Sequence, residues 1–106
     1  MPTLPTLIVF QINLESDDPG LFIKGNIFAI EDTINPVKQD WVIKKTRPAT
    51  GQLVADDYRF LFNVNNPGKF ELSVVTPASP EPVPVKFEVD KKGRLGLTLD
   101  FKVARR

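Results

Sequence analysis

The chain has 106 residues, with 14 Lys and Arg against 13 Asp and Glu, and it contains neither cysteine nor histidine. The length suits one domain over residues 1–106 with a core of its own. Without cysteine there are no disulfides or thiolate nucleophiles, and without histidine the usual general base is missing. A formal net charge of +1 gives no electrostatic footprint for nucleic acid. The composition therefore argues against an enzyme, a cofactor, a transition-metal site and a nucleic-acid partner.

The apolar runs are short, and the longest, Leu7–Phe10, is far below the length that crosses a bilayer. The N-terminal segment also lacks the basic start and small-residue cleavage site of a signal peptide. We therefore expect no direct membrane insertion. The compartment stays open, because a lack of cysteine suits both a reducing environment and a stable β core.

Apolar residues recur at every second position along most of the chain, which indicates half-buried β-strands rather than helices. The first strand is expected over Thr6–Leu14. The second spans residues 21–31, where Gly25 indicates a bulge, a bend or a close backbone approach. The third spans residues 40–46 and carries Trp41, the only tryptophan.

The segment Asp56–Pro77 alternates, breaks at Asn66-Pro67-Gly68 and alternates again. Pro67 presets its φ for a type II turn, and Gly68 supplies the positive φ that such a turn requires. The pattern therefore predicts a hairpin that builds the core, with its aromatic residues on one inner face: Tyr58, Phe60 and Phe62.

Residues 76–84 contain four prolines, which suit either a crossover between sheets or an edge guarded against pairing. Two more strands are expected at residues 85–89 and Leu95–Val103, with a tight turn at residues 90–94 that places Gly93 in the left-handed conformation. About seven strands at these spacings predict one antiparallel β-sandwich with Greek-key connections.

Several stretches resemble Ig-like and prealbumin-like domains, the latter including transthyretin-like and carboxypeptidase-regulatory-like modules. They are FIKGNIFAI from Phe22, DWVIKK from Asp40, YRFLFNVNNPGKFELSVVTP from Tyr58 and VPVKFEV from Val83. The resemblance covers roughly residues 22–89. It implies a sandwich that serves as a binding, spacer or assembly module, and it names no ligand.

Four residues are candidates for ligand binding: Trp41, Tyr58, Asp56 and Asp57. An exposed tryptophan is a stacking platform for a sugar, and the acidic pair lies near a turn. The competing interpretation places Trp41 in the core, and Tyr58 in the core with its hydroxyl bonded to a turn. Burial of Trp41 decides between them.

Three acidic pairs lie next to turns, where carboxylates suit calcium, although no calcium-loop spacing is present. Solvated loops are the preferred interpretation of all three: Asp17-Asp18, Glu31-Asp32 and Asp56-Asp57. Two basic clusters, Lys44 to Arg47 and Lys91 to Arg94, are interpreted as a solvated strand end and turn.

Three apolar residues lie out of phase with the inner faces and form a candidate interface: Val9, Leu61 and Val75. The first and last strands are candidate edges that pair across a homodimer. The favoured function is therefore an interaction or structural module that uses a sheet face or an edge strand and binds a protein partner or its own copy. The alternatives are a small-ligand or carbohydrate-binding module and a subunit of a viral or secretion assembly.

Overall fold

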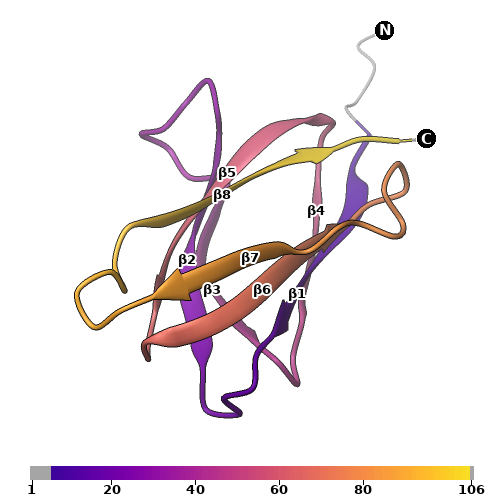
Figure 1. The fold of residues 1–106 in the computed structure, drawn as a ribbon. Helices are drawn as coiled ribbons and strands as arrows, with labels where there is room; N and C mark the ends of the chain where they lie inside the picture. Colours follow the sequence, from indigo (N-terminus) through magenta and orange to yellow (C-terminus); the bar gives the residue numbers. More distant parts are fainter. Residues whose placement is uncertain (1–5, 106) are drawn as a thin grey trace, which may run out of the picture.

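The computed structural model describes residues 6–105, so residues 1–5 and 106 of the predicted domain lie outside the described residues. The described chain is all-β, with eight antiparallel strands in two four-stranded sheets that pack face to face (Figure 1). The predicted all-β sandwich is confirmed, with eight strands in place of about seven.

The two sheets have different strand orders. Sheet A has the order β4-β1-β6-β7, in which the strands span Ala49–Leu53, Ile8–Glu15, Gly68–Val75 and Val85–Val89. Sheet B has the order β3-β2-β5-β8, in which they span Lys38–Lys44, Phe22–Ala29, Asp56–Val64 and Leu97–Val103.

The core lies between the sheets and consists mainly of every second residue along the strands. On β5 the even-numbered residues from 58 to 64 are buried, as the period-two pattern predicts. Opposite them, β1 and β6 contribute their own inward residues. The largest buried aromatic side chains are Phe10, Tyr58, Phe60, Phe62 and Phe70.

The predicted β5–β6 hairpin is wrong, because the chain passes from sheet B to sheet A between these strands. Asn65 holds the chain to β2: its side-chain Oδ1 accepts the Phe22 N–H (2.8 Å), and its N–H donates to the Phe22 carbonyl (3.1 Å). Gly68 has a positive φ of 142°, as predicted, but it begins β6. The rings of Phe62 and Phe70 therefore meet edge to face across the sandwich, with their centroids 6.2 Å apart. They are not neighbours on hydrogen-bonded strands of one sheet.

The next two connections are settled by the strand order. The proline-rich segment joins β6 to β7 within sheet A and leads into an edge strand, so of the two alternatives the guarded edge agrees with the structure and the crossover between sheets does not. The predicted tight turn at residues 90–94 is present, since the Gly93 N–H donates to the Asp90 carbonyl at 3.2 Å, but it lies in a passage from sheet A to sheet B. Gly96, not Gly93, has the positive φ, at 71°.

Gly25 behaves as predicted on both counts. The β2–β3 register shifts between Gly25 and Ile27. A Cβ on Gly25 would collide with the Leu61 carbonyl oxygen and with the Phe62 Cα, 2.6 Å away. A glycine is required here because the backbone of β5 lies directly against this position.

The edge predictions are half right. The first strand is not an edge, because β1 lies between β4 and β6. The last strand, β8, lies at the edge of sheet B, as predicted.

Candidate functional site

Trp41 lies at the rim of the sandwich on β3 and is half-buried. Its indole stacks on Phe10 of sheet A, with centroids 5.3 Å apart and planes 13° apart. It also covers Gly51 of β4, where a Cβ would lie 2.7 Å from two indole ring carbons. Trp41 therefore closes the side of the sandwich where β3 meets β4, which the alternating pattern did not reveal.

Tyr58 is buried, and its hydroxyl donates to the Val54 carbonyl at 2.6 Å. Burial raises the pKa of Tyr58 above its ordinary value, and the nearby Asp56 carboxylate adds to the increase. These contacts agree with the core interpretation of the residue, whose hydroxyl bonds back to the preceding turn.

The four candidate ligand residues do not converge. Trp41 pairs with Gly25, which in turn pairs with Phe62. Asp56 lies six residues from Phe62 along β5, a distance of roughly 20 Å. Asp56 and Asp57 are exposed at the start of that strand. The structure thus places the aromatic platform and the acidic pair at different ends of sheet B.

Two of the acidic pairs, Glu31-Asp32 and Asp56-Asp57, lie at the same end of the sandwich, because the Ile30 N–H donates to the Asp57 carbonyl at 3.1 Å. One carboxylate of each pair accepts hydrogen bonds locally, since Asp56 accepts the Asp57 N–H at 2.8 Å. Asp32 accepts the N–H groups of Ile34 and Asn35, and hydrogen bonds from Asn35 are the main reason that the pKa of Asp32 is lowered. Within residues 6–105, no three Asp or Glu side chains are grouped as metal ligands.

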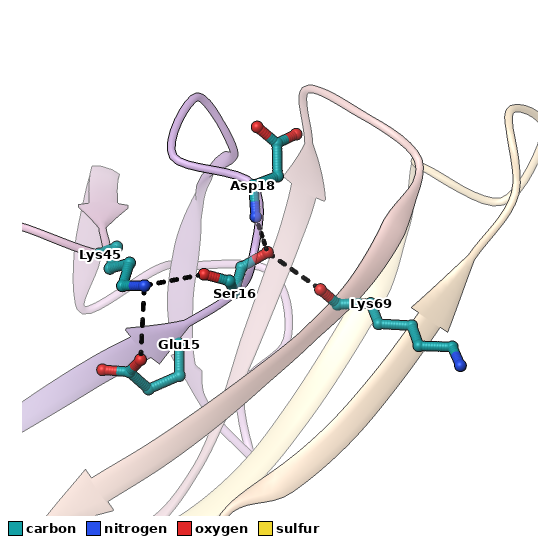
Figure 2. Close-up of polar contacts among 5 residues, drawn as sticks. All are labelled: Glu15, Ser16, Asp18, Lys45 and Lys69. Atoms are coloured by element: carbon teal, nitrogen blue, oxygen red, sulfur yellow. Dashed lines mark hydrogen bonds and ion pairs between the residues drawn. The ribbon is translucent and has the colours of Figure 1, made fainter.

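An open groove of about 660 Å³ lies where β1 and β6 separate. Ser16 lines this groove, and Figure 2 shows it at the centre of a set of polar contacts. The Ser16 hydroxyl donates to the Lys69 carbonyl at 3.0 Å and accepts the Asp18 N–H at 3.1 Å. Lys45 donates to the Ser16 carbonyl at 3.1 Å and approaches the Glu15 carboxylate to 4.0 Å. These contacts fasten the β1–β2 and β3–β4 loops to sheet A.

The charges around this groove alternate in sign. Lys69 lies opposite Glu88, and Glu71 lies opposite Lys86. Cross-strand pairs of opposite charge stabilise a sheet by neutralising one another. The groove therefore offers no concentrated charge to a ligand, and its polar groups serve the fold.

The three candidate interface residues divide between the two sheets. Val9 and Val75 lie on the outer face of sheet A, where Val75 is opposite Gln11. Leu61 lies on the outer face of sheet B, between Asn26 and Thr98. They do not form one patch.

The free edge of β8 has a defined set of main-chain groups. The Asn65–Phe22 and Ile30–Asp57 bonds show that odd-numbered residues of β5 direct their N–H and C=O groups toward β2. Because neighbours along an antiparallel ladder alternate, the even-numbered residues of β5 face β8.

The β5–β8 register then fixes the direction of each residue in β8. Tyr58 pairs with Phe101, so the odd-numbered residues of β8 face β5. Thr98, Asp100 and Lys102 therefore direct their main-chain groups to the free edge. The Ala104 carbonyl agrees with this alternation, since it accepts the Ala78 N–H (3.3 Å) on that side.

The other three edges are protected in ways that β8 is not. β3 is interrupted by Asp40, which has a φ of 54°, and by the register shift opposite it. β4 is short, with only five residues. β7 has five residues and follows prolines at 80, 82 and 84. In contrast, β8 has seven regular residues and no proline. Bulges, prolines and short strands are the usual protection of sheet edges.

A recess of about 240 Å³ opens beside this edge, between the sheets, and both apolar and polar residues line it. Phe101 lines it and is half-buried, and Val83 and Val85 at its mouth are 86% and 44% exposed. On the outer face, Arg59 binds Asp100 through two bonds of 2.7 and 3.1 Å. This hydrogen bonding is the main reason that the pKa of Asp100 is lowered.

Comparison of the chain with family models, with curated proteins and with solved structures gives no match. Over the part of the chain that the structure describes, there is no helix long and apolar enough to cross a membrane.

Proposed function

We propose that the protein is a non-enzymatic interaction module that binds an extended segment of a protein partner along the free edge of β8. The segment would add to sheet B as a further strand. The observation that carries this proposal is the regular, unprotected edge at Thr98, Asp100 and Lys102. Strand addition uses such an edge for main-chain hydrogen bonds, and pockets for alternate side chains give selectivity.

The recess beside β8 supports the same proposal. Inward side chains of an added strand would lie next to Phe101 and above the gap between the sheets. An apolar side chain there would cover Val85 and the half-buried ring of Phe101. We therefore expect preferred segments to carry apolar residues at every second position.

The resemblance to Ig-like and prealbumin-like domains remains part of this proposal. The pair of four-stranded antiparallel sheets is compatible with it. Modules of this kind commonly act by binding or assembly, which agrees with an edge-binding role.

The test is selection of displayed peptides on the wild-type protein, followed by affinity measurements on two variants. Lys102→Pro removes the outward N–H, and Lys102→Thr removes the same charge but keeps that N–H. Because the N–H faces away from β5, neither variant should lower the melting temperature greatly. We expect Lys102→Pro to weaken peptide binding about tenfold relative to Lys102→Thr, since a peptide carbonyl loses its donor. Equal binding by both variants would show that the peptides bind elsewhere.

A further inference from the structure

We infer that the occupant of the β8 edge is a second copy of this chain, so that two β8 strands pair antiparallel about a two-fold axis. This inference rests on the proposed function and names its partner. The paired sheets B would then form one continuous sheet of eight strands, counted from the four in each copy.

The main-chain groups restrict the register of such a pair. Only the even-numbered residues of β8 face the free edge, so even-numbered residues must pair with even-numbered ones. Three central registers are symmetric, with the axis at Leu99, Asp100 or Phe101. With the axis at Leu99, Asp100 lies opposite Thr98 and Lys102 lies opposite Gly96, so neither charge meets one of opposite sign. With the axis at Asp100, each Asp100 lies opposite its own copy, and like charges directly opposite one another are unfavourable.

With the axis at Phe101, each Asp100 lies opposite Lys102 of the partner subunit. The two symmetry-related Asp100–Lys102 pairs then bring opposite charges together, and the two residues of each pair exchange two main-chain hydrogen bonds. The Asp100 carboxylate is held in place by Arg59 from β5 while half of its side-chain surface (51%) stays exposed. The edge is therefore self-complementary in charge as well as in hydrogen bonding.

The same register brings the two Phe101 residues together in a non-hydrogen-bonded pair, where the Cα atoms lie about 4.5 Å apart. Phe101 already stacks with Phe10 and Tyr58, at 5.7 and 5.8 Å between centroids. A second Phe101 would extend this aromatic row across the axis and cover the half-buried ring. The formal net charge of +1 per chain gives little repulsion between the copies.

The experiment is sedimentation velocity over a concentration series of the full chain. We expect a concentration-dependent shift from monomer to dimer. Lys102→Glu should weaken the dimer about tenfold or more, because two favourable pairs become two like-charge pairs. Lys92→Glu makes the same charge change in an exposed position of the β7–β8 loop and should leave the dimer unchanged.

A mixing test uses the same symmetry. Asp100→Lys should also dissociate the dimer, whereas an equimolar mixture of Asp100→Lys and Lys102→Glu should form a heterodimer with both charge pairs restored. Circular dichroism checks the fold of each variant. If Asp100→Lys fails to fold, zero-length cross-linking of the wild-type protein tests the register. A carbodiimide couples carboxylates to amines in a mixture of ¹⁴N-labelled and ¹⁵N-labelled protein. A mixed-isotope link from Asp100 to Lys102 is the expected product.

Two failures have different meanings. A chain that stays monomeric throughout, yet binds peptides sensitive to Lys102→Pro, would overturn the second copy as partner and leave the edge-binding function intact. A dimer that is unaffected by both Lys102→Glu and Lys102→Pro and yields no Asp100–Lys102 link would place the contact elsewhere. If peptide binding were also unaffected by Lys102→Pro, the edge-binding function would be overturned as well.

Discussion

Among single residues, Gly51 and Trp41 form a close fit that depends on the missing methyl group of the glycine. The indole lies against the Gly51 backbone and stacks on Phe10. We expect Gly51→Ala to lower the free energy of unfolding by about 1–3 kcal/mol, because the indole must shift to admit a methyl group. Chemical denaturation followed by tryptophan fluorescence measures this loss.

Gly20→Ala is the matched control for that change. A Cβ on Gly20 would lie 3.5 Å from the Asp18 carboxylate oxygen, an ordinary contact. Stability and the emission maximum should therefore stay close to wild type in Gly20→Ala. A Gly51→Ala protein with unchanged stability and emission would show that the indole does not pack on this glycine.

Tyr58 offers a second test at this scale, because it is the only tyrosine in the chain. Tyr58→Phe removes the hydrogen bond to the Val54 carbonyl and leaves that acceptor without its donor. We expect a loss of about 1 kcal/mol in the free energy of unfolding, measured by urea denaturation at neutral pH. If the variant were as stable as wild type, the hydroxyl bond would contribute nothing net.

At the scale of elements, the contact between β2 and β5 depends on Gly25. A Cβ there meets main-chain atoms of Leu61 and Phe62, which cannot move without opening the ladder. We expect Gly25→Ala to cost about 3 kcal/mol or more, a larger loss than Gly51→Ala, where a side chain can yield. Parallel denaturation curves of the two variants test the order. The reverse order would mean that β2 and β5 can separate locally.

The sequence predicted which face of each strand is buried but not which strands are partners. Alternation at β5 and β6 correctly assigned Phe60 and Phe70 to the core, since period two reports only burial. It cannot distinguish a hairpin from a passage between sheets, because both bury the same residues. The deciding contacts are those of Asn65 with Phe22, which are distant in sequence.

The candidate sites show the same limit. The sequence suggested a ligand surface from Trp41 as a stacking platform and Asp56 near a turn, but their separation along sheet B follows from strand register. The direction of the β8 main-chain groups also follows from register, through β5 and β2. The prediction of β8 as an edge needed only its place at the end of the chain. Its lack of protection became visible once the other three edges were known.

For the molecule as a whole, the free energy of unfolding should depend on pH only in the acid and alkaline ranges. The carboxyls of Asp32 and Asp100 have lowered pKa values, owing to hydrogen bonds from Asn35 and Arg59 respectively, so their stabilisation is present above about pH 4 and is lost as pH falls further. Burial raises the pKa of Tyr58, so its stabilisation is present below about pH 10 and is lost above it.

The chain has no histidine, so we expect the free energy of unfolding to be nearly flat between about pH 5 and pH 9. Urea denaturation at a series of pH values, with tyrosinate absorbance recorded on the alkaline side, measures this profile. Tyr58→Phe should remove the alkaline loss and leave the acid side unchanged. A transition centred near pH 7 would contradict the assignment.

The left-handed conformation of Asp40 has a consequence for how large an assembly through sheet B can grow. β8 and β3 are the two edge strands of that sheet. If both edges accepted strands, β8 of one copy could pair with β3 of the next. The contact would then be heterologous and open-ended, as in a fibre. Asp40 and the adjoining bulge make the β3 end a poor template. Pairing at β8 alone is isologous and closes after two copies.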